Sequence, residues 1–172
     1  QTMMLAQQLY EGMELGEGPQ GLITYMRTDS LSLSEESLAR SKSFLEKEIG
    51  PEYSLPSPRR FKTKTKGAQE AHEAIRPTDP FRTPESIKQF LDRRQYRLYN
   101  LIWSRFMAGQ MPEAVFDATS IDVLATGKDS TQYGFRSSGQ ILRFDGFLKI
   151  YPTKFTELTL PNLNPEELLE LI

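Results

Sequence analysis

The segment GLITYMRTDS, residues 21–30, joins a short apolar run to a polar turn and places Tyr25 two residues before Arg27. Its first part, LITYM, is apolar, β-branched and aromatic, which predicts a short strand. Side chains alternate between the two faces of a strand, so Ile23, Tyr25 and Arg27 are expected to share one face. The sequence therefore predicts that Tyr25 and Arg27 are neighbours.

Helices are predicted on both sides of this strand. Residues 2–12 precede it with apolar side chains at helical spacing. After it, Ser32 and Glu35 form a capping box for a helix that Gly50 and Pro51 end. The next stretch, PEYSLPSPRRFKTKTKGAQ, is rich in proline, lysine and threonine, so an exposed basic connection is expected there.

The middle of the chain is also predicted to be helical. Residues 69–76 are expected to form a helical turn ahead of Pro77, because a residue before proline avoids the α region. Thr83 and Pro84 start a helix that runs to about Arg93. Asp92 and Gln95 start another, whose apolar stripe is predicted to be core. That stripe consists of Leu98, Tyr99, Ile102, Trp103 and Phe106.

From about residue 117 the chain changes to β-rich pieces. ATSIDVLAT, QYGFRSS and QILRFDGFLKIYP are separated by GKDS and SSG, which predicts an antiparallel hairpin or meander. Asn164 and Pro165 predict the start of a final helix that the end of the chain cuts short. The expected fold class is α+β, with one domain at residues 1–116 and a second at residues 117–172.

Composition narrows the classes of function. The 172-residue chain has a formal net charge of −2, but residues 1–54 carry −5, residues 55–110 carry +7 and residues 111–172 carry −4. The middle third is therefore a candidate surface for a polyanion. Without cysteine and with one histidine, neither a disulfide framework nor a cysteine or histidine metal cluster is expected.

The sequence also gives expectations about where the protein is located and whether the chain is complete. No apolar run approaches the roughly 18 residues that a membrane span needs, so no membrane partner is expected. The absence of cysteine fits a reducing, cytoplasmic origin. Because the chain begins at Gln1 and ends within a helical pattern, it is expected to be a piece of a longer protein.

Tyr25 has two interpretations. A tyrosine has a reference pKa of about 10 and becomes a nucleophile only with a base, a metal or a cation beside it. Arg27 could serve as that cation, or could hold a phosphate through its forked donors. The alternative is a packing aromatic of the strand, which is the commoner role for such a residue, followed by a turn at TDS.

His72 and a basic run are the other candidates. His72, in EAHEAIRP, could contact a phosphate or carry a proton, although an isolated histidine is more often a surface residue. The basic run places five cations within eight residues, either as phosphate contacts or as a solvated loop. Those cations are Arg59, Arg60, Lys62, Lys64 and Lys66.

The combination of GLITYMRTDS, QEAHEAIRPTD some forty residues later, and RFDGF resembles the central region of type IA DNA topoisomerases, in the bacterial topoisomerase I subgroup. Both long motifs match at nearly every position, and the resemblance extends to about Tyr151. The YMRTDS motif lacks the proline that typically follows the tyrosine in topoisomerase III.

This resemblance implies a reaction and its residues. Tyr25 corresponds to the nucleophile that attacks a single-stranded DNA phosphodiester and forms a 5′-phosphotyrosine bond without ATP. Arg27 corresponds to the arginine beside the scissile phosphate, and His72 to a histidine that contacts nearby phosphates. Arg76, in the second motif, joins the basic run as an expected DNA-binding residue. The implied parent enzyme relaxes negatively supercoiled DNA at the nucleoid.

The resemblance also implies an architecture. Residues 1–116 would form a mostly helical, winged-helix-like domain that bears the tyrosine, and residues 117–172 would belong to a β-rich arch. The family's metal-binding domain, whose acidic cluster holds Mg²⁺, has no counterpart in this chain. That domain is the expected partner within the same polypeptide, no metal ligand is expected here, and the fragment alone is expected to be inactive.

Two other functions compete with this one. The first is a stand-alone winged-helix module that binds nucleic acid and uses Tyr25 only for packing. The second is a tyrosine recombinase or a relaxase. A recombinase surrounds its tyrosine with several positive groups and histidines, and a relaxase needs a histidine-metal cluster, so the single histidine counts against both.

Overall fold

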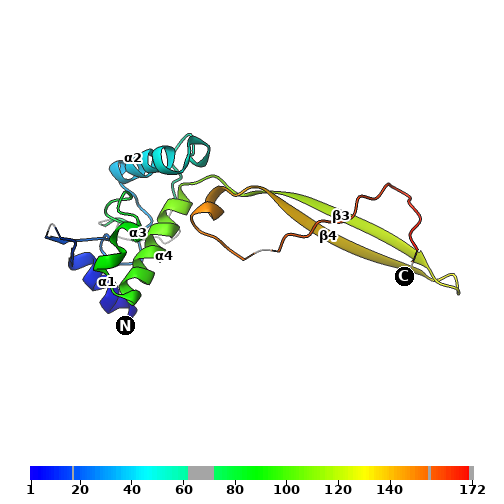
Figure 1. Cartoon of the computed structure of the whole chain (residues 1–172), viewed down its shortest axis with the longest axis horizontal. Helices are drawn as coiled ribbons and strands as arrows, with labels where there is room; N and C mark the ends of the chain where they lie inside the picture. The colour runs from blue at the N-terminus through cyan, green and yellow to red at the C-terminus, as the bar shows by residue number, and fades with distance from the viewer. Residues whose placement is uncertain (17, 62–71, 155, 171–172) are drawn as a thin grey trace. The chain divides into compact units, whose positions relative to one another are not determined.

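The computed structural model describes residues 1–16, 18–61, 72–154 and 156–170, which divide into two compact units (Figure 1). Gln1–Glu113 and Gly146–Pro152 form the first, here called the tyrosine unit; Ala114–Asp145 and Thr153–Ile172 form the second, here called the hairpin unit. Helices lie in the first and a long antiparallel ribbon in the second, in agreement with the α+β class. Residues 146–152 return to the tyrosine unit, which the sequence did not indicate.

Helices of the tyrosine unit form close to the predicted positions. In chain order they are α1 (Thr2–Glu11), α2 (Glu35–Phe44) with a π-helical turn (Leu45–Ile49), α3 (Pro84–Ile87) with a 3-10 turn (Lys88–Phe90), and α4 (Arg93–Gly109). The predicted capping box of α4 is present: the Asp92 carboxylate accepts from the N–H groups of Arg94 and Gln95, and Gln95 Oε1 accepts from Asp92 N–H. Local capping chemistry thus placed the start of α4 correctly.

The predicted capping box of α2 is wrong in its register. Ser34, rather than Ser32, is the N-cap residue, and its hydroxyl accepts from the Ser37 N–H at 3.2 Å. The N–H of Ser34 donates to Glu73 Oε2 at 3.1 Å, so a carboxylate 39 residues away completes the cap. The helix ends as predicted, at Gly50 with φ 142° followed by Pro51.

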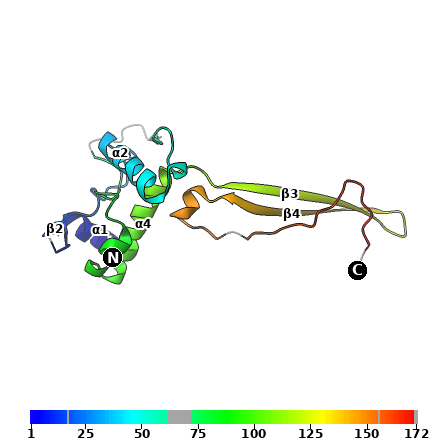
Figure 2. The same cartoon turned by 45° about the horizontal axis from the view of Figure 1, so that its top comes forward.

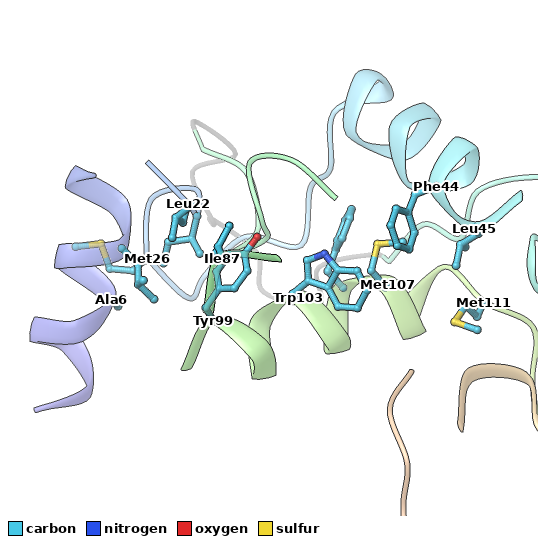
Figure 3. Close-up of a cluster of buried hydrophobic side chains, with 13 residues drawn as sticks. Ala6, Leu22, Met26, Phe44, Leu45, Ile87, Tyr99, Trp103, Met107 and Met111 are labelled. Atoms are coloured by element: carbon cyan, nitrogen blue, oxygen red, sulfur yellow. The ribbon is translucent and has the colours of Figure 1, made fainter. Parts of the chain in front are cut away.

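The core of the tyrosine unit lies between α1, α2 and α4 (Figure 3). Tyr99, Trp103 and Phe106 of the predicted stripe are buried, and Leu98 and Ile102 pack against them partly exposed, which confirms the stripe as core. Trp103 meets Phe44 edge to face, with ring centroids 5.5 Å apart. Its indole N–H donates to the Pro80 carbonyl at 2.9 Å, so the buried polar group is satisfied.

The predicted strand around Tyr25 is wrong. Residues 22–26 form only one isolated bridge, between Ile23 and Pro77, because their backbone groups bond to two different segments. Leu22 N–H donates to the Leu9 carbonyl at 2.7 Å, whereas Thr24 N–H donates to the Arg76 carbonyl at 3.0 Å. The chain bends at residue 24, so Ile23 is buried while Tyr25 is 48% exposed, and these two do not share a face.

The predicted helical turn before Pro77 is also absent from its described part, residues 72–76. Ala74 N–H donates to the Ser32 carbonyl at 2.8 Å, and Arg76 N–H donates to Thr24 Oγ1 at 2.9 Å. These N–H groups therefore bond to residues 32 and 24 instead of to carbonyl groups within a helix. Between α1 and the Tyr25 segment, β1 (Met13–Glu14) and β2 (Pro19–Gln20) pair antiparallel as two strands of two residues each.

The hairpin unit contains β3 (Val115–Thr126) and β4 (Gln132–Phe144), which pair antiparallel along their length (Figure 2). The expected break at SSG is wrong, because Gly139 lies within β4. A Cβ at Gly139 would meet the Leu158 carbonyl oxygen at 2.2 Å, and Leu158 N–H bonds the Gln140 carbonyl at 3.2 Å. Gly139 therefore does not end the strand. The absence of a side chain there lets the segment around Leu158 pack closely against β4.

The predicted final helix is wrong as well. Residues 164–167 make only a turn, although Glu167 Oε2 accepts from the Asn164 N–H at 2.8 Å as a capping side chain would. Glu166 has φ 63°, which a right-handed helix does not allow, and Leu168 is 97% exposed. Without an apolar face to bury, a segment this short does not hold a helix. Among the described helices, none has the length and apolar character to cross a membrane.

Candidate active site around Tyr25

Tyr25 lies at the surface of the tyrosine unit between two other rings. Its ring centroid is 5.4 Å from that of Tyr10, at the end of α1, and 6.1 Å from that of His72, both in edge-to-face geometry. A Cβ at Gly21 would stand 2.8 Å from the Tyr10 carbonyl oxygen, so glycine permits the close approach of α1 to this segment. The nucleophile candidate is thus exposed but its ring is held on two sides.

Asp29 connects the other two candidates. Its Oδ2 is 2.9 Å from Arg27 Nε, and its Oδ1 is 2.7 Å from His72 Nε2. Loss of hydration opposes ionisation of Asp29, but the hydrogen bonds from His72 and from its own backbone, with the charge of Arg27, lower its pKa below the ordinary value. An ionised Asp29 therefore holds Arg27 and His72 in place near Tyr25.

Both ring nitrogens of His72 have hydrogen-bond partners in this arrangement. Nδ1 faces the Glu73 carbonyl oxygen at 3.0 Å and Nε2 faces the Asp29 carboxylate, and both of these groups are acceptors. The site therefore places the Arg27 guanidinium and the His72 imidazole around one carboxylate.

Arg27 keeps most of its guanidinium available. Its Nε contacts Asp29, its side chain is 55% exposed, and its two terminal nitrogens have no hydrogen bond within the described part of the chain. Those nitrogens form the forked donor pair that matches a phosphate. Chemically, the site offers the Tyr25 phenol, the anion-binding fork of Arg27 and the His72 imidazole on one surface.

Arg76, the fourth charged candidate, is used internally. Its Nε and Nη2 bond the two carboxylate oxygens of Glu73 at 2.7 and 3.0 Å, and its Nη1 donates to the Pro77 carbonyl at 2.9 Å. The Arg76 side chain is 11% exposed. Arg76 therefore forms, with Glu73, an ion pair whose carboxylate also accepts from the Ser34 N–H at the start of α2; these contacts are here called the Glu73 clamp. Because its guanidinium is used in this way, Arg76 is not proposed as a DNA contact.

Neutralising Glu73 is expected to weaken this clamp. Glu73→Gln removes the charged partner of Arg76 and weakens the cap of α2, so the free energy of unfolding at pH 7 should fall by about 1–2 kcal/mol. Thermal or urea unfolding of the chain measures this. The matched control is Glu85→Gln, since Glu85 pairs with Lys88 at 2.9 Å on the surface and should change stability by less than about 0.5 kcal/mol.

The same variant tests the pH dependence of stability. The Arg76 hydrogen bond, against some loss of hydration, lowers the pKa of Glu73 below its ordinary 4.5. Ionised Glu73 therefore contributes fully above the unfolded value and loses its contribution as the pH falls through the lower folded value. Wild-type protein should lose more unfolding free energy between pH 7 and pH 3 than Glu73→Gln. Parallel losses in the two proteins would contradict this assignment.

The basic run is not brought into contact with Tyr25 by any described interaction. One terminal nitrogen of Arg60, Nη2, donates to both carboxylate oxygens of Glu35, at 2.7 and 2.8 Å. The Gln110 side chain pairs with the backbone N–H and carbonyl of Arg59 at 3.0 Å each. Lys62, Lys64 and Lys66 lie outside the described residues. Arg59 and Arg60 line a separate cavity of about 140 Å³ with Leu31 and Leu38.

Tyr10 and the connecting role of Asp29 were not predicted. Asp29 lies within the first motif, but TDS is also ordinary turn chemistry, so the sequence alone did not distinguish a bridge from a turn. Tyr10 gave no signal, because its contact with Tyr25 depends on the fold of the glycine-rich segment between them. Among the described residues, no group of three or more histidine, cysteine, aspartate or glutamate side chains could hold a metal ion.

The whole chain, residues 1–172, matches the family model described as DNA topoisomerase. DNA topoisomerase 1 of Rickettsia conorii is 45% identical over 150 residues, which is 87% of this chain and 19% of that protein. The Helicobacter pylori protein of the same name is 42% identical over 170 residues, 99% of this chain and 22% of its own length. This chain therefore spans about a fifth of the length of these relatives.

A solved structure shows the same fold. Full-length topoisomerase I from Thermotoga maritima superimposes with a TM-score of 0.75 at 35% sequence identity. The match covers 95% of this chain and 25% of the solved one.

Proposed function

Because this chain belongs to the type IA DNA topoisomerase family, in its bacterial topoisomerase I subgroup, we propose that it supplies the nucleophile of an enzyme that relaxes negatively supercoiled DNA. The observation that carries this proposal is the exposed Tyr25 beside the linked side chains of Arg27, Asp29 and His72. Single-stranded DNA is the proposed substrate of the cleavage step, and the cytoplasmic nucleoid is the proposed place of action.

The proposed step exchanges one ester for another. The Tyr25 phenolic oxygen attacks the phosphorus of a DNA phosphodiester, a P–O bond to tyrosine forms, and the P–O3′ bond breaks. The phenol loses its proton, and the leaving 3′ oxygen gains one and becomes a free hydroxyl. Because a phosphodiester is retained, the reverse attack by that hydroxyl restores the strand without ATP.

Charge stabilisation is the proposed task of the neighbouring residues. The free fork of Arg27 binds the phosphate oxygens, where negative charge increases as the phenolic oxygen attacks. His72, whose ring lies beside that of Tyr25, is the proposed contact to neighbouring phosphates, for which one of its ring nitrogens exchanges its present partner, Asp29 or Glu73. The ionised carboxylate of Asp29 keeps Arg27 and His72 in position.

Other parts of the polypeptide complete the enzyme in this proposal. The described residues do not fit a metal site, so we derive no step through a metal and assign Mg²⁺ to the metal-binding domain elsewhere in the polypeptide. Residues 1–116 correspond to the winged-helix-like tyrosine domain and residues 117–172 to part of the arch. The long exposed ribbon of β3 and β4 fits an arch segment, since a two-stranded ribbon is marginal alone.

The chain alone is expected to neither cleave nor relax DNA, because electrostatic and metal contributions worth several kcal/mol each lie elsewhere. Replacing the matching segment of the Helicobacter pylori relative, 42% identical, with this chain should give an enzyme that relaxes negatively supercoiled plasmid. Agarose gels report both results. Relaxation by the isolated chain, or a folded chimera that remains inactive, would contradict the proposal.

A further inference from the structure

A second surface feature adjoins Arg27. A cavity of about 340 Å³ opens between the first motif, the end of α4 and the start of the basic run. Its lining includes the buried or half-buried apolar side chains of Leu33, Ile75 and Phe106, here called the floor, and the exposed side chains of Arg27, Phe61 and Arg105, here called the rim. The volume lies within the range of small-ligand sites, roughly 300–1,000 Å³.

Phe61 presents an aromatic ring at this cavity. The side chain is 48% exposed, and a Cβ at Gly109 would stand 3.9 Å from its ring carbon Cζ, an ordinary contact distance, so the ring lies against α4. The Gln110 side chain holds the backbone of Arg59, two residues earlier, through two hydrogen bonds of 3.0 Å. The ring is therefore supported by the helix while part of its surface stays open.

The charge at the rim is positive. Arg27 keeps its terminal nitrogens available, and Arg105 contacts the Tyr151 ring at 5.4 Å without an ion pair among the described residues. Among the described residues, no aspartate or glutamate lines the cavity. The cavity therefore suits a ligand that combines a flat ring with an anion, because it offers an aromatic ring, an apolar floor and two arginines.

We propose that this cavity binds one nucleotide of single-stranded DNA, with its base stacked on Phe61 and a flanking phosphate between Arg27 and Arg105. The inference rests on the proposed function and deepens it. Because Arg27 belongs both to the Tyr25 site and to this rim, the bound nucleotide lies close to the scissile phosphate. Stacking accepts any base, so the site fixes the position of the strand without reading its sequence.

The test separates base stacking from backbone charge. Binding of the full chain to fluorescent oligo(dT) and to an abasic oligomer of the same length is measured by anisotropy. Phe61→Ala should weaken oligo(dT) binding about tenfold and leave abasic binding within roughly twofold, whereas Phe61→Tyr should retain wild-type binding. Phe135→Ala is the matched control, because Phe135 is an exposed phenylalanine of the hairpin unit, with 60% of its surface accessible against 48% for Phe61.

The charge contribution has its own control. Arg105→Gln should weaken the binding of oligo(dT) and of the abasic oligomer by a similar factor, since both carry phosphates. The control is Arg97→Gln, two turns earlier on the exposed side of α4, which should have a smaller effect on binding. Equal weakening of oligo(dT) and abasic binding by Phe61→Ala, or none, would overturn the subsite. The proposed function would survive that result, because it depends on the covalent product of Tyr25.

Discussion

Replacing Arg27 by alanine is expected to slow formation of the covalent DNA–tyrosine product by roughly 100- to 1,000-fold. The free fork of Arg27 is the group best placed to bind phosphate oxygens as their charge increases, and its loss removes that stabilisation from the transition state. Arg27→Lys should recover only part of the rate, because an ammonium does not reproduce the two-pronged contact. Single-turnover cleavage by this chain mixed with a relative's metal-binding portion gives the rates.

Arg40 offers a matched control for this prediction. Arg40 also pairs with an aspartate on the surface, with Nη2 2.8 Å from Asp79 Oδ1, and its side chain is 45% exposed. Removing an exposed pair of this kind costs little stability. Arg40→Ala should therefore change the cleavage rate by no more than about twofold, and an equal loss in the two variants would refute the role given to Arg27.

Elements specified by nearby residues could be predicted from the sequence. The capping box at Asp92 and Gln95 and the stripe of α4 depend on residues within one or two turns, so their pattern was sufficient. The end of the α2 segment at Gly50 and Pro51 is equally local. Even here a distant group takes part: the N-cap residue of α2 is Ser34 rather than Ser32, and its N–H donates to the Glu73 carboxylate.

Elements specified by distant partners could not be predicted. Residues 22–26 have the composition of a strand, but their backbone bonds go to Leu9 and Arg76, and the second lies some fifty residues away. No periodicity in the segment carries that information. Gly139 is a similar case. The reason for a glycine there is the close approach of Leu158, which is known only once the segment after β4 has been placed beside that strand.

The candidate site divides in the same way. Tyr25, Arg27 and His72 were identified from their motifs, and the structure brings them together through Asp29 and the ring contact between Tyr25 and His72. Their catalytic roles stay predictions. Arg76 has the same motif signal, yet only the structure shows that Glu73 and Pro77 occupy its guanidinium.

The central claim is that Tyr25 becomes covalently bound to a 5′-phosphate of DNA. The most direct measurement mixes this chain with the separately made metal-binding portion of a relative, Mg²⁺ and a single-stranded oligonucleotide labelled at its 3′ end, and examines denatured protein for label. We expect a labelled band that Tyr25→Phe abolishes and Tyr10→Phe retains, because only Tyr25 supplies the attacking oxygen. No band from two folded, associated parts, or a band that persists in Tyr25→Phe, would contradict the account.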